Sequence, residues 1–173
     1  MTDLVFTTKH GSRLYGLATG ESDEDTFTVT TSRHTKARQS VTILPDGRVI
    51  DTVRVGLEVF LHRVFEGSHQ SVEALFSPYK VWGDSAAAIQ YHHYLGGMRV
   101  TGRAVFEKYE RTIKTFCYGD YKRRRHAVRL SLNLRDLRYE GRFNPVMTPF
   151  MIDYATDLAS NYEGEELWKH LTS

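Results

Sequence analysis

The sequence predicts an α+β fold in which strands in the first part of the chain give way to helices in the second. Two short runs, residues 4–8 and 26–31, are apolar or alternate between apolar and polar residues, as strands do. The runs 41–44 and 48–55 flank a Pro-Asp-Gly turn, which predicts a hairpin. From Gly56 onward the apolar residues recur with a helical period.

Helices are expected over most of the remaining chain. In the first of them, the apolar face is expected to carry Leu57, Phe60, Leu61, Val64 and Phe65, and the helix ends at Gly67. Pro78 and Gly83 then interrupt the pattern, so we expect a packed junction between two units, residues 1–80 and 81–173. The expected helices span residues 57–65, 71–76, 84–109, 120–137 and 149–158.

The composition excludes several classes of protein. The chain has 173 residues, 40% of them hydrophobic, which is enough to bury a sizeable core. Its formal net charge of +2 is too small for a protein that binds polyanions with its whole surface, so any anion site must be local. Cys117 is the single cysteine and cannot form an intrachain disulfide. Without a signal peptide or a run of roughly 18 apolar residues, we expect no membrane association and a cytoplasmic location.

The pair Gly11-Ser12 follows the first predicted strand. A glycine and a serine at such a corner can direct backbone N–H groups and a hydroxyl toward a phosphate, because glycine permits close approach. An ordinary turn after a strand has the same residues. By itself the pair leaves both interpretations open.

Asp23, Glu24 and Asp25 lead into the second predicted strand. Residues two apart on a strand project to the same face, so Asp23 and Asp25 are expected to lie side by side, with Glu24 on the other face. Two close carboxylates repel unless a cation lies between them, and Mg²⁺ prefers such oxygen ligands. A solvated acidic loop is the alternative.

Asp51 interrupts an otherwise β-prone run from Arg48 to Val53. Aspartate is unfavourable in the middle of a strand and needs a physical reason to be there. Either Asp51 lies on the solvated face of an edge strand, or it faces Asp23 and Asp25 and completes a metal site. The spacing alone does not decide between the two.

The Gly-Ser pair, the Asp-x-Asp motif and Asp51 together indicate a function more specifically than any one of them does alone. Metal-assisted nucleotidyl transfer needs a corner for the triphosphate, carboxylates for the metal ions and a further carboxylate near the acceptor hydroxyl. A Gly-Ser pair, a gap of ten residues and an Asp-x-Asp motif resemble the signature of the DNA polymerase beta superfamily of nucleotidyltransferases.

A closer resemblance is to the predicted nucleotidyltransferases of bacteria and phages, including those encoded beside RNA ligases. These proteins share a Gly-Ser-x-x-Tyr-Gly-x-Ala-Thr segment that ends in Ser-Asp-x-Asp, similar to residues 11–25 here. The likeness continues through residues 51–53 and 71–78. It also includes Lys122, His126 and Arg129, which are similar to a Lys-x-x-x-His-x-x-Arg-Leu helix and would share one stripe of that helix. That stripe would grip either the triphosphate or a polyanionic acceptor.

The resemblance implies a mixed β-sheet flanked by helices, with residues 1–80 as the catalytic core and residues 81–173 completing the nucleotide and acceptor cleft. It also implies transfer of NMP from an NTP to an acceptor hydroxyl, with two Mg²⁺ ions, or Mn²⁺ in their place, in a bacterial or phage-infected cell. The acceptor stays open: an RNA end, a protein or a small molecule. The alternative is a nucleotide- or RNA-binding module without chemistry. The implied catalytic and metal-binding residues are Asp23, Asp25 and Asp51, and the implied nucleotide-binding residues are Gly11, Ser12, Arg13, Tyr15, Lys122, His126 and Arg129.

Overall fold

The N-terminal part of the chain forms one mixed β-sheet. Within residues 2–18, 22–33 and 36–172, which the computed structural model describes, five strands are arranged in the order β3-β4-β2-β1-β5. β2 and β4 are parallel, and the other neighbouring strands are antiparallel. The strands are β1 (Leu4–His10), β2 (Glu24–Thr30), β3 (Arg38–Ile43), β4 (Val49–Gly56) and β5 (Val81–Trp82).

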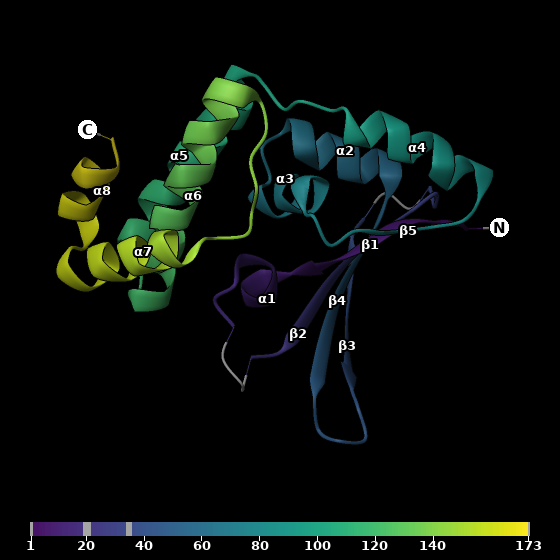
Figure 1. Cartoon of the computed structure of the whole chain (residues 1–173), viewed down its shortest axis with the longest axis horizontal. Coiled ribbons are helices and arrows are strands. Elements are labelled where there is room, and N and C mark those ends of the chain that lie inside the picture. Colours follow the sequence, from purple (N-terminus) through teal and green to yellow (C-terminus); the bar gives the residue numbers. More distant parts are fainter. Residues whose placement is uncertain (1, 19–21, 34–35, 173) are drawn as a thin grey trace.

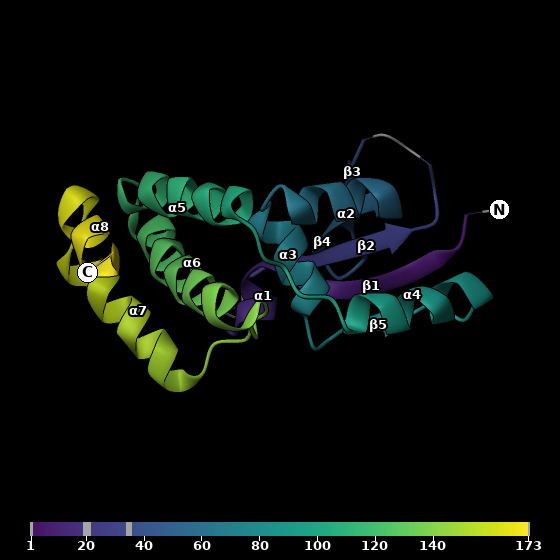
Figure 2. The same ribbon diagram turned by 90° about the horizontal axis from the view of Figure 1, so that it is seen from above.

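The helices lie beside and beyond this sheet, so the predicted α+β class with a helical C-terminal half is confirmed. α2, α3 and α4 lie close to the sheet, whereas α5 to α8 gather beyond its α1 end (Figures 1 and 2). Among the described residues, no helix is both long and apolar enough to cross a bilayer. The helices are α1 (Gly11–Tyr15), α2 (Leu57–Phe65), α3 (His69–Phe76), α4 (Ala86–Gly96), α5 (Arg103–Cys117), α6 (Tyr121–Glu140), α7 (Pro149–Asn161) and α8 (Gly164–Thr172).

The structure differs from the predicted elements at three places. The stretch expected to be helical from residue 84 to 109 is divided into α4 and α5, because Gly102 adopts a φ of 136° that interrupts a helix. The Gly11-Ser12 corner is one helical turn, which ends at Gly16 with a φ of 79°. β5 and α8 were not predicted, and the two residues of β5 are too few to show a period.

An aromatic cluster fixes α2 against the sheet. Phe60 lies at the predicted apolar face of α2, and its ring centroid is 5.5 Å from that of Phe6 and 6.0 Å from that of Phe27. All three side chains are almost fully buried. Burying a side chain of this size contributes on the order of 2 kcal/mol. Phe65, which was expected on the same face, is instead 50% exposed.

A buried ion pair joins α3 to α6. The Arg129 guanidinium Nη1 donates a hydrogen bond to Glu73 Oε1 at 2.5 Å, and the Tyr15 hydroxyl donates to Glu73 Oε2, also at 2.5 Å. Burial would raise the pKa of Glu73, but the nearby Arg129 and the hydrogen bonds outweigh it and lower that pKa. The pair connects the parts of the chain on either side of the expected junction. β5, which follows residue 80, also belongs to the sheet through its pairing with β1.

Replacing Arg129 with methionine should lower the free energy of unfolding by about 3–5 kcal/mol, because the Glu73 carboxylate would stay buried without its partner. Removing both charges in a Glu73→Leu/Arg129→Met protein should cost less than the sum of the two single changes, since no unpaired charge would remain. Chemical denaturation of the four proteins measures this. Additivity to within about 0.5 kcal/mol would contradict the interpretation.

Candidate active site

A hollow of about 350 Å³ lies where β1, β2 and β4 meet α1, α3 and α6. It brings together residues that are far apart in the sequence and that the sequence singled out. Seven further lining residues were not singled out: His10, Thr26, Gln39, Val53, His69, Gln70 and Phe116. The predicted residues in its lining are Gly11, Ser12, Tyr15, Asp25, Asp51, Lys122, His126 and Arg129.

Two carboxylates lie next to each other in this hollow. Asp25 and Asp51 occupy directly paired positions on the parallel strands β2 and β4. β4 is an interior strand, because β3 covers its other side, so Asp51 is not on a sheet edge. Of the two alternatives for Asp51, the structure supports the one in which it neighbours Asp25.

The surroundings of this pair favour a bound cation. Burial raises the pKa of Asp25; His10 opposes this, the negative charges of Asp51 and Asp23 add to it, and Lys122 opposes it. Gln39 Nε2 donates to Asp51 Oδ2 at 2.7 Å, whereas Asp51 Oδ1 is buried with no hydrogen-bond partner among the described residues. An unpartnered buried carboxylate oxygen beside a second carboxylate suits a divalent cation.

Asp23 and Arg13 lie outside this hollow. β2 begins at Glu24, so Asp23 precedes the strand, and it lines a neighbouring hollow together with Arg13. Arg13 Nε donates to the backbone oxygen of Asp23 at 3.1 Å, and its Nη2 donates to that of Ser22 at 2.7 Å. Arg13 thus holds the loop before β2. Among the described residues, no three His, Cys, Asp or Glu side chains are close enough to hold an ion by themselves.

Glycine at position 11 permits the close approach between α1 and Asp25. Gly11 has a φ of 61°, and a Cβ built on it would lie 2.0 Å from Asp25 Oδ2. No other residue fits without displacing the carboxylate. Ser12, the next residue, also lines the hollow.

The three residues expected to share one stripe of α6 all line this hollow, but they differ in charge. Arg129 is 2% exposed and is paired with Glu73. Its Nε donates to His126 Nδ1 at 3.3 Å, and burial together with the Arg129 charge lowers the pKa of His126 to about 4. His126 is therefore neutral at pH 7. Because its Nδ1 atom accepts a hydrogen bond, its Nε2 atom carries the hydrogen and can act as a donor. Lys122 is exposed and is the cation of this stripe that can meet an anion.

His10 and His69 are the site residues that the sequence did not reveal. His10 pairs with Asp25 across β1 and β2, is 7% exposed, and has an Nδ1 atom without a described partner. Burial lowers the pKa of both histidines. The position of His10 directly before Gly11 was a usable signal, whereas nothing near His69 distinguishes it from a surface histidine.

No protein-family model and no curated protein sequence matches the chain. Among solved structures, the chain is similar to a nucleotidyltransferase-like protein from Exiguobacterium sibiricum, at 10% sequence identity and a TM-score of 0.43. The alignment covers 98% of this chain and 65% of that protein, so this chain spans less than two thirds of its length. A likeness this distant concerns overall architecture and says nothing about the site.

Replacing Gly11 with alanine should destabilise the protein more than the same change at Gly16. Both glycines have positive φ values, so each substitution should cost about 1–2 kcal/mol in backbone strain. Only at Gly11 would the new methyl group also strike Asp25, because the nearest atom to a Cβ at Gly16 is 3.8 Å away. Chemical denaturation compares the two variants. Equal losses would show that the contact with Asp25 is not needed.

The buried histidines should make the protein less stable in acid. The pKa of the His126 side chain is about 4 in the folded protein, whereas its ordinary value is 6.5. As the pH falls, the unfolded chain therefore takes up a proton at this histidine before the folded protein does. Its contribution is complete above pH 6.5 and is lost as the pH falls toward 4, by on the order of 3 kcal/mol. His126→Gln should flatten this part of the stability profile, and His62→Gln, at an exposed histidine, should not. Identical profiles for both variants would refute the assignment.

Proposed function

We propose that the protein transfers a nucleoside monophosphate from a nucleoside triphosphate to an acceptor hydroxyl, with release of pyrophosphate. The observation that carries this proposal is the pairing of Asp25 with Asp51 in one hollow with Gly11, Ser12 and Lys122. The acceptor oxygen forms a bond to the α-phosphorus while the bond from that phosphorus to the β-phosphate oxygen breaks. The acceptor proton leaves to a carboxylate, and the pyrophosphate takes the electron pair of the broken bond.

Divalent Mg²⁺, or Mn²⁺ in its place, fits the carboxylate pair. Asp25 and Asp51 would hold it, because their charges repel and Asp51 Oδ1 lacks a described partner. When bound, the ion neutralises charge on the phosphates. Two carboxylates provide fewer ligands than Mg²⁺ takes, so phosphate oxygens and water would complete its coordination. Asp23, in the segment just before β2, would add a third carboxylate if that segment moved toward Asp25.

The other residues of the hollow bind and orient the substrate. Gly11 leaves room for a phosphate beside Asp25, and the Ser12 hydroxyl donates a hydrogen bond to it. Lys122 supplies a positive charge from the opposite wall, while neutral His126 donates through Nε2. Asp51 accepts the proton of the acceptor hydroxyl. Arg129 and Tyr15 act indirectly, since their polar groups are already bound to Glu73 and they position His126 and α1.

A nucleotide-binding module without chemistry is the second candidate. The position of Asp23 favours this second candidate. Asp23 lines a different hollow, so Asp25 and Asp51 have no third metal-binding carboxylate beside them among the described residues. Such a module would be stabilised by an NTP and a divalent ion but would release no pyrophosphate.

Replacing Asp25 or Asp51 with asparagine should reduce transfer by roughly a hundredfold or more, since a bound ion supplies several kcal/mol and about 1.4 kcal/mol is a factor of ten. The assay follows α-labelled ATP, CTP, GTP and UTP with Mg²⁺ into total RNA and total protein, together with pyrophosphate release. Asp136→Asn, at an acid on the far part of α6, is the matched control.

The two candidates give different results in this assay. Label that moves onto one acceptor pool with the wild-type protein and the Asp136→Asn control, but not with the other two variants, supports transfer. Stabilisation by an NTP without any pyrophosphate release refutes transfer and supports the binding module. The Asp25→Asn protein should stay folded, because it loses a buried charge that its neighbour repels.

A further inference from the structure

The sheet has a second face, turned away from the hollow, which we call the outer face. Side chains alternate along a strand, so Asp25 and Asp51 point to one side while the residues that follow them point to the other. A row of directly paired residues crosses four strands on this outer face. It consists of Arg38, Arg54, Thr28 and Thr7.

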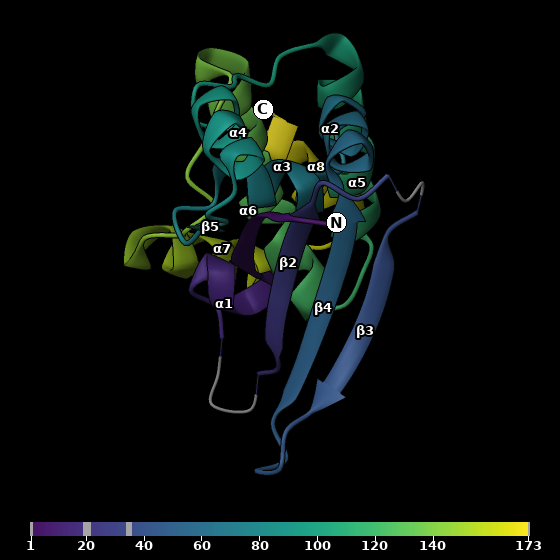
Figure 3. The same ribbon diagram turned by 90° about the vertical axis from the view of Figure 1, so that its right-hand side faces the viewer.

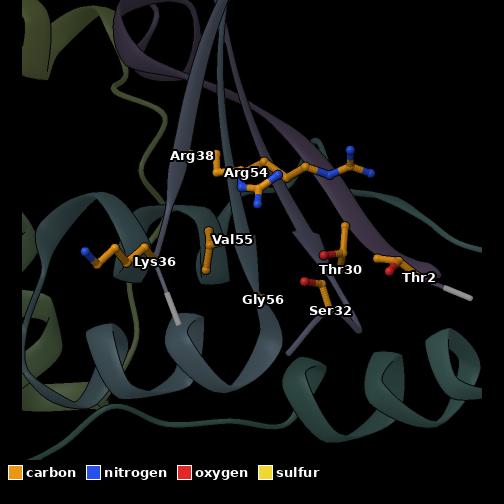
Figure 4. A pocket seen from close by; sticks show the side chains of 8 residues that line it. All are labelled: Thr2, Thr30, Ser32, Lys36, Arg38, Arg54, Val55 and Gly56. Carbon is orange, nitrogen blue, oxygen red and sulfur yellow. The ribbon is translucent and has the colours of Figure 1, made fainter. Parts of the chain in front are cut away.

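The pairing of Arg38 with Arg54 is unfavourable unless an anion lies near it. Like charges at directly opposed positions of neighbouring strands destabilise a sheet. Both arginines are exposed, and neither has an ion-pair partner among the described residues. Figure 4 shows their side chains beside a hollow of about 150 Å³ whose lining also includes the hydroxyls of Thr30 and Ser32. The described lining of this hollow contains no carboxylate.

The next row of the outer face continues the same chemistry. It consists of Ser40, Thr52, Thr26 and Lys9, again directly paired across the four strands. Of these four, Thr26 also belongs to the lining of the hollow. Thr26 and Thr52 share a hydrogen bond of 2.9 Å between their hydroxyls. In such a pair one hydroxyl accepts and keeps its own hydrogen, which can be donated outward. None of the residues in the two rows is buried, and the described rows contain no acidic residue.

We propose that the outer face binds single-stranded RNA through its phosphates and ribose hydroxyls. This proposal does not depend on the chemistry proposed for the hollow. Four strands roughly 4.8 Å apart make each row about 14 Å long, which suits a chain of phosphates better than a single one. Arginine and hydroxyl groups are common donors to phosphate oxygens. The 2′-hydroxyl of RNA can in addition donate to, or accept from, the threonine hydroxyls.

The composition of the two rows favours a nucleic acid over a protein partner. Protein interfaces have an apolar, often aromatic centre, and the described rows hold only cations and hydroxyls. The face is also accessible, since the helices lie to one side and β2, β4 and β3 extend beyond them (Figure 3). A polar, cationic surface that spans several strands matches the backbone of a nucleic acid.

Binding of a fluorescein-labelled 20-nucleotide single-stranded RNA of mixed sequence, followed by fluorescence anisotropy, tests the proposal. Contacts from Lys9, Arg38 and Arg54 predict that log K falls with log salt concentration with a slope of about −2. The Arg38→Gln/Arg54→Gln protein should bind roughly tenfold to thirtyfold more weakly at 0.1 M salt, with a slope near −0.7. Arg111→Gln/Arg142→Gln removes the same charge away from the sheet and should leave the affinity within twofold of the wild type.

Several outcomes would overturn the proposal. One is equal loss of affinity in the two double variants, which would make the effect one of net charge. Another is loss of binding in Lys122→Gln/Arg123→Gln with full binding in Arg38→Gln/Arg54→Gln, which would place the RNA on α6. Equal affinity for DNA of the same sequence would refute the selection of RNA. Thermal unfolding checks that Arg38→Gln/Arg54→Gln is folded, and its midpoint should not fall, because the change removes a repulsion.

Discussion

The buried carboxylate of Glu73 is the feature on which the candidate site depends. Taking a charge out of water is costly, and it is tolerated here because Arg129 and Tyr15 each donate to one of its oxygens. The Arg129 guanidinium also lies 3.6 Å from the centre of the Tyr15 ring. These contacts tie α1, α3 and α6 together. The walls of the hollow therefore hold a fixed geometry even though they come from three separate parts of the chain.

The same cluster sets the electrostatics of the hollow. The Arg129 guanidinium is paired with Glu73. If it bound a triphosphate instead, the buried Glu73 carboxylate would be left unpaired. Burial, together with the charge of Arg129, lowers the pKa of His126 and keeps this side chain neutral at pH 7. Lys122 is then left to face the repelling pair Asp25 and Asp51. A polyphosphate would meet more negative than positive charge there, which is the reason that the proposed function includes a divalent cation between it and the carboxylates.

The sequence predicted the elements and residues whose signals are local. The hairpin around Pro45-Asp46-Gly47 and the apolar face of α2 depend on neighbours within a few positions. The hairpin is confirmed, and so is the apolar face of α2 except at Phe65. The hollow has eight of the ten predicted site residues in its lining. Asp23 was expected beside Asp25, but β2 starts one residue too late for that alternation to apply. The roles of Glu73 and His69 depend on packing between distant segments, which no short pattern contains.

Strand register explains how one sheet supports two polar surfaces. In β2 and β4 the side chains of Asp25 and Asp51 lie on the side of the hollow. Those of the next residues, Thr26 and Thr52, alternate to the other side, although Thr26 also belongs to the lining of the hollow. A shift of the pairing by one residue would exchange the two sets, and it would also expose Phe27. The burial of Phe27 against Phe60 therefore fixes the register. The apolar core, which takes no part in binding, thus decides which side of the sheet carries carboxylates and which side carries hydroxyls and cations.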